Sequence, residues 1–131
     1  MAVFYEKEGF VEASYLNKII TVRWYKMFNS TIVRECCEAQ LEKVKEGARV
    51  IIVDIATATG KPSKELQEWF GTYLFPQMKE NGLKAIINVI PKNILVRTAA
   101  NEWNKTGEPF GFGMFETSSL IMARKKAREF V

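Results

Sequence analysis

Two short, mainly apolar runs constrain the fold of this chain more than any other feature of its sequence. They are "ARVIIVDI" at residues 48–55 and "LKAIINVI" at residues 83–90. A strand with one face in water alternates apolar and polar residues, whereas a strand covered on both faces is apolar along most of its length. These short runs, rich in valine and isoleucine, therefore predict two interior strands of a sheet that is covered by helices.

The segment before the first run predicts an antiparallel hairpin. In "FVEASYL" (residues 10–16) apolar and polar residues alternate, as they do in a strand with one buried face. Asn17 marks a tight turn into "KIITVRWY" (residues 18–25), which carries the same alternation. Residues 3–7 fit a further short strand ahead of the hairpin.

The rest of the chain alternates helical and extended patterns. We predict one α/β domain over residues 1–131, in the element order ββαβαβαβα. Its mixed sheet has an N-terminal antiparallel hairpin, parallel later strands and about four helices. The elements after the hairpin are a helix at 29–47, the strand at 48–55, a helix that Ser63 caps, that Pro76 interrupts and that Asn81-Gly82 ends, the strand at 83–90, a helix at 92–107, a strand at 109–116 and a helix at 117–131.

Composition argues against bond-making chemistry. The 131 residues include no histidine, so the commonest general base and the commonest transition-metal ligand are both absent. Cys36 and Cys37 are adjacent, and no second Cys or His pair completes a zinc site. Cys37 shares an apolar helical stripe with Val33, Leu41 and Val44, which predicts a place in the core. We expect no enzyme, metal or cofactor.

Charge and hydropathy limit the partners. The net charge is +4, and four cations lie in "RKKAR" at residues 124–128. At helical spacing they spread around the circumference, which indicates a solvated C-terminal helix and no nucleic-acid surface. No apolar run approaches the roughly 20 residues of a membrane span, and the N-terminus lacks the features of a signal peptide. We expect a cytoplasmic protein without stable membrane insertion.

The loop after the first apolar run contains Gly60-Lys61 and resembles a phosphate-binding loop only in part. The first glycine of that motif is replaced by Ile55, and Pro62 stands where a hydroxyl group would bind magnesium. Asp54 ends the strand, a position that favours ligand contacts in α/β sheets. The simpler alternative is that the Asp54 carboxylate binds N–H groups of the loop.

Glycines give the predicted last strand an unusual surface. Phe110, Phe112 and Met114 share one face, while Gly111 and Gly113 leave the other face without side chains. Such positions let another group approach the backbone closely. Either a closely packed helix or a ligand cavity would fit there.

Several stretches spread over nearly the whole chain occur in an order and spacing typical of one family. They are Trp24 followed by a capped helix, "IIVDI" ending in Asp54, "ELQEWF" with Trp69, "LFPQMKENGLKAIINVIP" with Pro76 and Gly82, and "FET" entering a helix. On these stretches the chain resembles the STAS-like superfamily, specifically its SpoIIAA-like (STAS/SEC14-type) bacterial branch. The resemblance implies a mixed sheet with helices packed around it.

The resemblance also implies a place for a phosphorylation switch. In classical STAS proteins, the anti-sigma factor antagonists, a partner kinase phosphorylates a serine at the helix start after such a loop. Ser63 lies nine residues after Asp54, close to the matching place. A phosphate there would meet free helix N–H groups and would add nearly two negative charges. Ser63 is alternatively a plain N-cap, and Thr57 and Thr59 are further candidates for the switch.

Two functional hypotheses follow. The first is a non-enzymatic regulatory module that docks a protein partner through the loop and helix after Asp54. The second is a carrier of a small apolar molecule or lipid, with a pocket bordered by three tryptophans and the glycine-bearing strand. The aromatic residues also fit a homodimer face. The pocket candidates are Trp24, Trp69, Trp103, Gly111 and Gly113.

Overall fold

The computed structural model describes residues 2–89 and 94–131. Within these residues the chain forms a six-stranded sheet whose strands lie side by side in sequence order. The first three strands pair antiparallel, and the third to sixth pair parallel, which confirms the predicted mixed α/β sheet. The strands are β1 (Ala2–Lys7), β2 (Val11–Leu16), β3 (Ile19–Trp24), β4 (Val50–Asp54), β5 (Ala85–Val89) and β6 (Gly113–Thr117).

The hairpin turn between β2 and β3 has two residues. Asn17 and Lys18 both have positive φ angles, of 50° and 67°, as a type I′ turn requires. This turn pairs Leu16 with Ile19 and places Val11 opposite Trp24. The further strand that residues 3–7 predict is present as β1, which forms one edge of the sheet.

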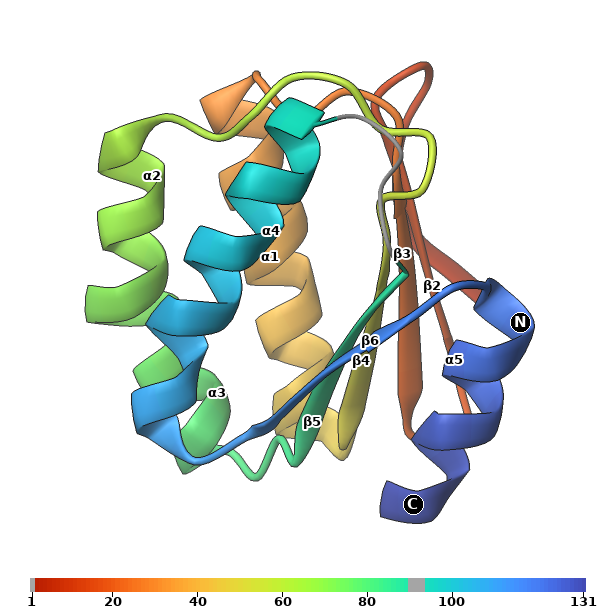
Figure 1. Cartoon of the computed structure of the whole chain (residues 1–131). Coiled ribbons are helices and arrows are strands. Elements are labelled where there is room, and N and C mark those ends of the chain that lie inside the picture. The colour runs from red at the N-terminus through yellow and green to blue at the C-terminus, as the bar shows by residue number, and fades with distance from the viewer. Residues whose placement is uncertain (1, 90–93) are drawn as a thin grey trace.

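Helices cover the two faces of the sheet unequally. Figure 1 shows α1 to α4 on one face and α5 alone on the other. No helix in the described part of the chain combines the length and apolar character needed to cross a membrane. The helical elements are α1 (Ser30–Glu46), α2 (Lys64–Trp69), the π-helical turn η1 (Phe70–Leu74), α3 (Phe75–Glu80), α4 (Ile94–Gly107), the 3-10 turn η2 (Glu108–Phe110), α5 (Leu120–Ala127) and the 3-10 turn η3 (Arg128–Phe130).

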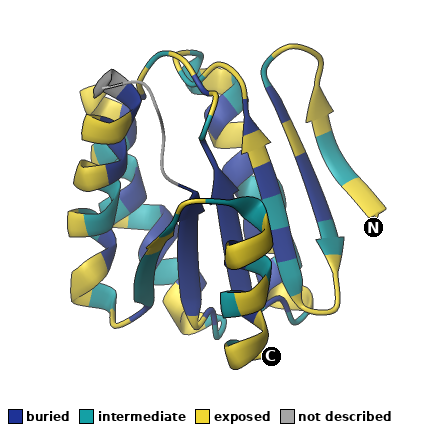
Figure 2. Cartoon of the chain, turned by 45° about the vertical axis from the view of Figure 1, so that its right-hand side comes forward, coloured by how far each residue is buried: buried dark blue, intermediate teal, exposed yellow. Residues whose placement is uncertain are grey.

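Strands β4 and β5 are buried along their whole length, as their apolar sequences predict (Figure 2). Ile51 and Ile86 face the core under α1 to α4. Ile52 and Ile87 face the smaller core under α5. The end of the predicted strand at 83–90 and the start of the predicted helix at 92–107 include residues 90–93, which lie outside the described residues.

Pro76 interrupts the regular α-helix after Ser63, as predicted, but the chain does not leave the helical conformation there. The chain stays helical from Lys64 to Glu80, with η1 immediately before the proline-bearing α3. The N–H of Phe75 binds the carbonyl of Phe70, five residues earlier. In a regular helix the proline ring clashes with the carbonyl four residues before it. The wider turn accommodates the proline without ending the helix.

The predicted last strand at 109–116 is wrong at its start. Residues 108–110 form η2, and Gly111 follows with a φ of +79°, so β6 begins only at Gly113. A Cβ atom at Gly113 would overlap the ring of Phe115, which fills the space on that face. One at Gly111 would meet the side chain of Lys79. The two glycines therefore do not share an open face.

Candidate functional site

The loops after β3 and β4 lie together at the carboxyl ends of the two strands. The Thr59 N–H donates to the Tyr25 carbonyl at 3.0 Å, and the Met27 N–H donates to the Thr59 carbonyl at 2.9 Å. Lys26 and Thr59 also form a parallel β-bridge. We call residues 25–30 and 55–64 the two-loop surface. Its position is the edge where parallel sheets usually bind ligands.

Asp54 stabilises the base of this surface. Its Oδ2 atom accepts a hydrogen bond from Arg23 Nε at 3.1 Å, and its Oδ1 atom accepts one from the Ala56 N–H at 3.3 Å. The residue is only 8% exposed. The pKa of Arg23 is raised, first by hydrogen bonding to the Tyr25 side chain and then by Asp54. Both carboxylate oxygens thus bind groups of the protein itself, as the simpler interpretation of Asp54 expects.

The three hydroxyl groups proposed for a switch lie on the two-loop surface. The Ser63 Oγ atom accepts the Leu66 N–H at 3.2 Å and caps α2, and it lies 3.5 Å from Ser30 Oγ. Thr59 Oγ1 donates to the Tyr25 carbonyl at 3.3 Å. Thr57 is exposed. Ser63 therefore is an N-cap, and its side chain is also open to solvent.

Two aromatic side chains that the sequence did not single out face solvent on this surface. Phe28 is 58% exposed and Tyr25 is 40% exposed. The Phe28 ring packs edge-on against Phe10 at 6.0 Å, and its side chain fills the space beside Gly60. Both residues follow the last alternating residue of β3, where the period-2 pattern stops and gives no signal of exposure or burial.

The charge of the two-loop surface is positive. Lys26, Lys61 and Lys64 are exposed, and residues 25–30 and 55–64 contain no aspartate or glutamate. Lys61 Nζ lies 3.5 Å from Glu102 Oε1 of α4, with both side chains nearly half exposed. Lys26 Nζ lies over the Phe10 ring at 5.4 Å. The surface thus presents aromatic rings among cations.

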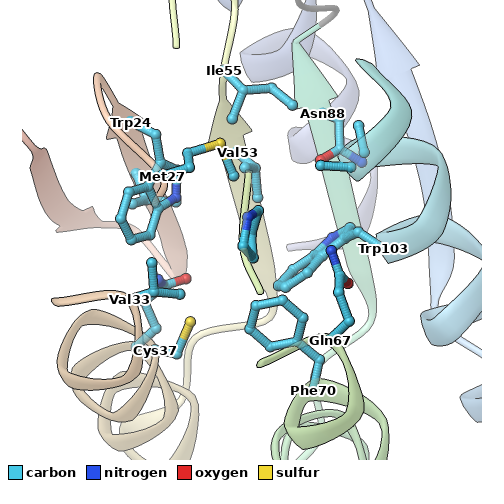
Figure 3. Close-up of a pocket in the computed structure, with 15 residues that line it drawn as sticks. Trp24, Met27, Val33, Cys37, Val53, Ile55, Gln67, Phe70, Asn88 and Trp103 are labelled. Carbon is cyan, nitrogen blue, oxygen red and sulfur yellow. The ribbon is translucent and has the colours of Figure 1, made fainter. Parts of the chain in front are cut away.

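A cavity of about 40 Å³ lies beneath the two-loop surface, between the sheet and the helices (Figure 3). Strands β3, β4 and β5 form one wall, and α1, α2, η1 and α4 form the other. Met27 and Pro62 line it from the two loops. None of the described side chains that line the cavity is acidic or basic.

The predicted tryptophan pocket forms only in part. Trp24 and Trp103 line the cavity, but Trp69, Gly111 and Gly113 do not belong to its lining. Trp69 instead stacks on Tyr73 at 5.4 Å, with the guanidinium group of Arg34 over its ring at 5.6 Å.

Three polar atoms are buried at the cavity without a hydrogen-bond partner among the described residues. They are Nε2 and Oε1 of Gln67 and Nε1 of Trp103. Figure 3 shows both side chains entering from the same side of the cavity. The Trp103 ring packs nearly perpendicular to the rings of Phe70 and Phe75, at 4.5 and 4.6 Å between centroids. The sequence did not predict Gln67 as a site residue, because a glutamine on a helix normally faces water.

The remaining polar residues of the cavity have partners. Asn88 donates from Nδ2 to Asn104 Oδ1 at 2.8 Å, and Gln40 donates from Nε2 to Cys36 Sγ at 3.4 Å. Cys36 and Cys37 are free thiols and both are buried, as predicted for Cys37. Burial raises the pKa of Cys36 to about 12 and that of Cys37 well above its usual value. The cavity wall, which includes Cys37, is thus uncharged at neutral pH.

The candidate site is assigned from its geometry alone, because known proteins offer no guide to it. Neither the family models, nor the curated proteins, nor the solved structures give a match to this chain. Within residues 2–89 and 94–131, no group of three or more His, Cys, Asp or Glu side chains is arranged to hold a metal ion.

Proposed function

We propose that this protein is a non-enzymatic interaction module that docks an acidic protein partner through the two-loop surface. One observation carries the proposal: exposed Tyr25 and Phe28 lie among three exposed lysines, with no acidic residue on the same surface. Aromatic side chains provide most of the energy of many interfaces, and complementary charge directs the encounter.

The geometry of the loops supports docking. Hydrogen bonds at Tyr25, Met27 and Thr59 connect the two loops within the chain itself. A preformed surface loses less conformational entropy on binding. In a two-fold contact between copies the lysines would face each other, so the charge favours an acidic partner over a homodimer through this surface.

We further propose that the fold is STAS-like and that phosphorylation of Ser63 regulates docking. The support is the order of the elements, with Asp54 at the end of β4, a loop, and a helix that Ser63 caps. A phosphate at Ser63 would add nearly two negative charges beside Lys64. It would repel an acidic partner, so phosphorylation is expected to weaken docking. The loop alternatives Thr57 and Thr59 would act in the same direction.

A charge-reversal pair tests the docking proposal. Partners are captured from a lysate of the source cells and the interaction is then measured with the purified partner. Lys26→Glu with Lys64→Glu should abolish binding, while the matched pair Lys84→Glu with Lys105→Glu, which changes the net charge equally outside the two-loop surface, should retain it. Raising the salt concentration should weaken wild-type binding. Equal binding by both pairs would disprove the proposal.

Aromatic truncation provides a second arm. Phe28→Ser removes an exposed ring from the two-loop surface, and Ile121→Ser removes an exposed side chain from α5, where Ile121 is 78% exposed. Only the first variant should weaken binding of the purified partner.

The phosphorylation switch is tested separately: Ser63→Asp should bind the partner more weakly than Ser63→Ala. Identical affinities would remove Ser63 as a regulator and leave the docking surface itself untouched.

The second candidate function is a carrier of a small molecule, and the cavity beside Trp24 and Trp103 favours it. Pockets for drug-sized ligands enclose about 300–1,000 Å³. A cavity of about 40 Å³ is far too small for a lipid. Native mass spectrometry of the purified protein tests the lipid carrier, because a co-purifying lipid would appear as a fixed mass increment.

A further inference from the structure

The buried polar atoms at the cavity point to a ligand of defined chemistry. Buried polar groups in proteins almost always have a hydrogen-bond partner, because removing them from water is otherwise costly. Here one glutamine amide and one indole N–H lack such a partner among the described residues, and both side chains line the same cavity. We infer that the cavity is a binding site for a small uncharged molecule with a carboxamide or lactam edge.

The neutral lining determines the charge of the ligand. No acidic or basic side chain is present among the described lining residues, and the Cys37 thiol keeps its proton because burial raises its pKa. A charged ligand would therefore enter a poorly solvating space without a counter-charge. The site selects a neutral molecule.

The hydrogen-bonding pattern determines the functional group. The Gln67 side chain offers an acceptor, Oε1, and a donor, Nε2, along one planar edge. A second carboxamide or a lactam has the complementary edge, with a carbonyl beside an N–H. The Trp103 Nε1–H group donates only, so it requires an acceptor such as that carbonyl. Hydrocarbons satisfy neither residue.

The size of the cavity sets the scale of the ligand. A buried water needs a cavity of about 10–15 Å³. The volume of this cavity, about 40 Å³, is a few times larger. The space fits a group the size of formamide or acetamide. Met27 and Pro62 belong to the loops, and a flexible methionine adapts easily to a larger occupant. The site thus holds a ligand no larger than a small amide, or the amide end of a larger one.

The first test uses acetamide and acetate, which have nearly the same shape but differ in charge. Titrations of the ¹⁵N-labelled protein are followed through the indole N–H signal of Trp103 and the side-chain amide signals of Gln67, with acetate added at equal ionic strength. We expect saturable shifts of both residues with acetamide and none with acetate. Shifts that rise linearly without saturation, or equal shifts with both compounds, would show that the cavity is not a selective site for a neutral amide and would overturn the inference.

The second test uses variants. Gln67→Leu removes the amide while keeping an apolar side chain, and it should weaken acetamide binding about tenfold or more, measured at the Trp103 signal. The control Asn101→Leu changes an exposed residue of α4 and should bind as wild type does. Trp103→Phe, followed at the Gln67 signals, replaces the first variant if that one fails to fold. Unchanged affinity in a folded Gln67 or Trp103 variant would overturn the inference.

This inference does not depend on the docking proposal. The Lys26→Glu and Lys64→Glu pair should lose partner binding and still bind acetamide with wild-type affinity, because neither lysine lines the cavity. Failure of one proposal is thereby distinguished from failure of the other.

Discussion

The Nε atom of Arg23 lies 3.1 Å from the Oδ2 atom of Asp54. The two residues are direct register partners across β3 and β4, where the antiparallel hairpin meets the parallel part of the sheet. Because Asp54 also accepts the Ala56 N–H, one carboxylate links the hairpin, β4 and the following loop. This arrangement makes Asp54 a structural residue of the two-loop surface.

Removing the Asp54 carboxylate should therefore reduce stability. The Arg23 side chain is 48% exposed, so the ion pair contributes less than about 1 kcal/mol, and the bond to the Ala56 N–H contributes about as much again. Asp54→Ala should lower the free energy of unfolding by about 1–2 kcal/mol in urea titrations. Asp54→Asn can still accept from Ala56 and should lose less. A larger loss in Asp54→Asn than in Asp54→Ala would contradict this account.

The N-cap at Ser63 makes a second prediction. Ser63→Ala should lower the free energy of unfolding by about 1 kcal/mol, because the Leu66 N–H loses its side-chain acceptor. Ser63→Asp should remain close to wild type, since aspartate caps helices as well as serine does. Thr57→Ala, an exposed loop change, is the control and should leave stability unchanged. Thermal and urea unfolding of the four proteins would check the order.

The interior of the sheet could be predicted from sequence because a single physical requirement determines it. The side chains of Ile52 and Ile87 pack into the core on the α5 side of the sheet. The neighbouring side chains of Ile51 and Ile86 pack into the core on the opposite side. Strands covered on both faces leave no position for a polar surface residue, and so their sequences are mainly apolar. Helical periodicity identified the buried stripe of α1 that contains Cys37.

The helix after Ser63 could not be predicted in the same detail. The five-residue hydrogen bond from Phe75 to Phe70 adds a residue to one turn and rotates the side chains that follow relative to a regular helix. Gln67 and Trp69 lie before this turn, in α2, where the sequence pattern did not show that Gln67 lines the cavity and that Trp69 packs on Tyr73 instead. At the last strand, Phe110 and Phe112 imitate a period of two, but Pro109 and Gly111 form a turn.

The contact between Gly113 and Phe115 makes a third prediction. A methyl group at position 113 would overlap the Phe115 ring, which packs against Phe130 at 5.5 Å between centroids. Gly113→Ala should destabilise the protein by about 1–3 kcal/mol, as overpacking in a core usually does. In a Phe115→Ala background the same change should cost much less, because the ring is gone. A double-mutant cycle measured by urea unfolding tests this, and additive effects would contradict it.

The buried thiols predict a loss of stability at alkaline pH. An unperturbed thiol loses its proton near pH 9.0, whereas Cys36 in the folded chain has a pKa of about 12. Between these values the unfolded chain binds fewer protons than the folded chain, so the free energy of unfolding decreases as the pH rises. Below pH 9 this effect is absent. Each thiol should contribute a slope of up to about 1.4 kcal/mol per pH unit.

Urea unfolding at pH 8 and pH 10 would measure this decrease, and Cys36→Ala with Cys37→Ala should largely remove it. Tyr5 also has a raised pKa, of about 12, for which burial is the main cause. Its ordinary value of 10.0 lies a full unit above that of the thiols, so it affects chiefly the upper part of the range. Burial raises the pKa of Tyr73 as well, from the same ordinary value. The pH interval between 8 and 10 therefore reports mainly on the cysteines. An equal decrease in the double alanine variant would show that ionisation of the thiols is not the cause.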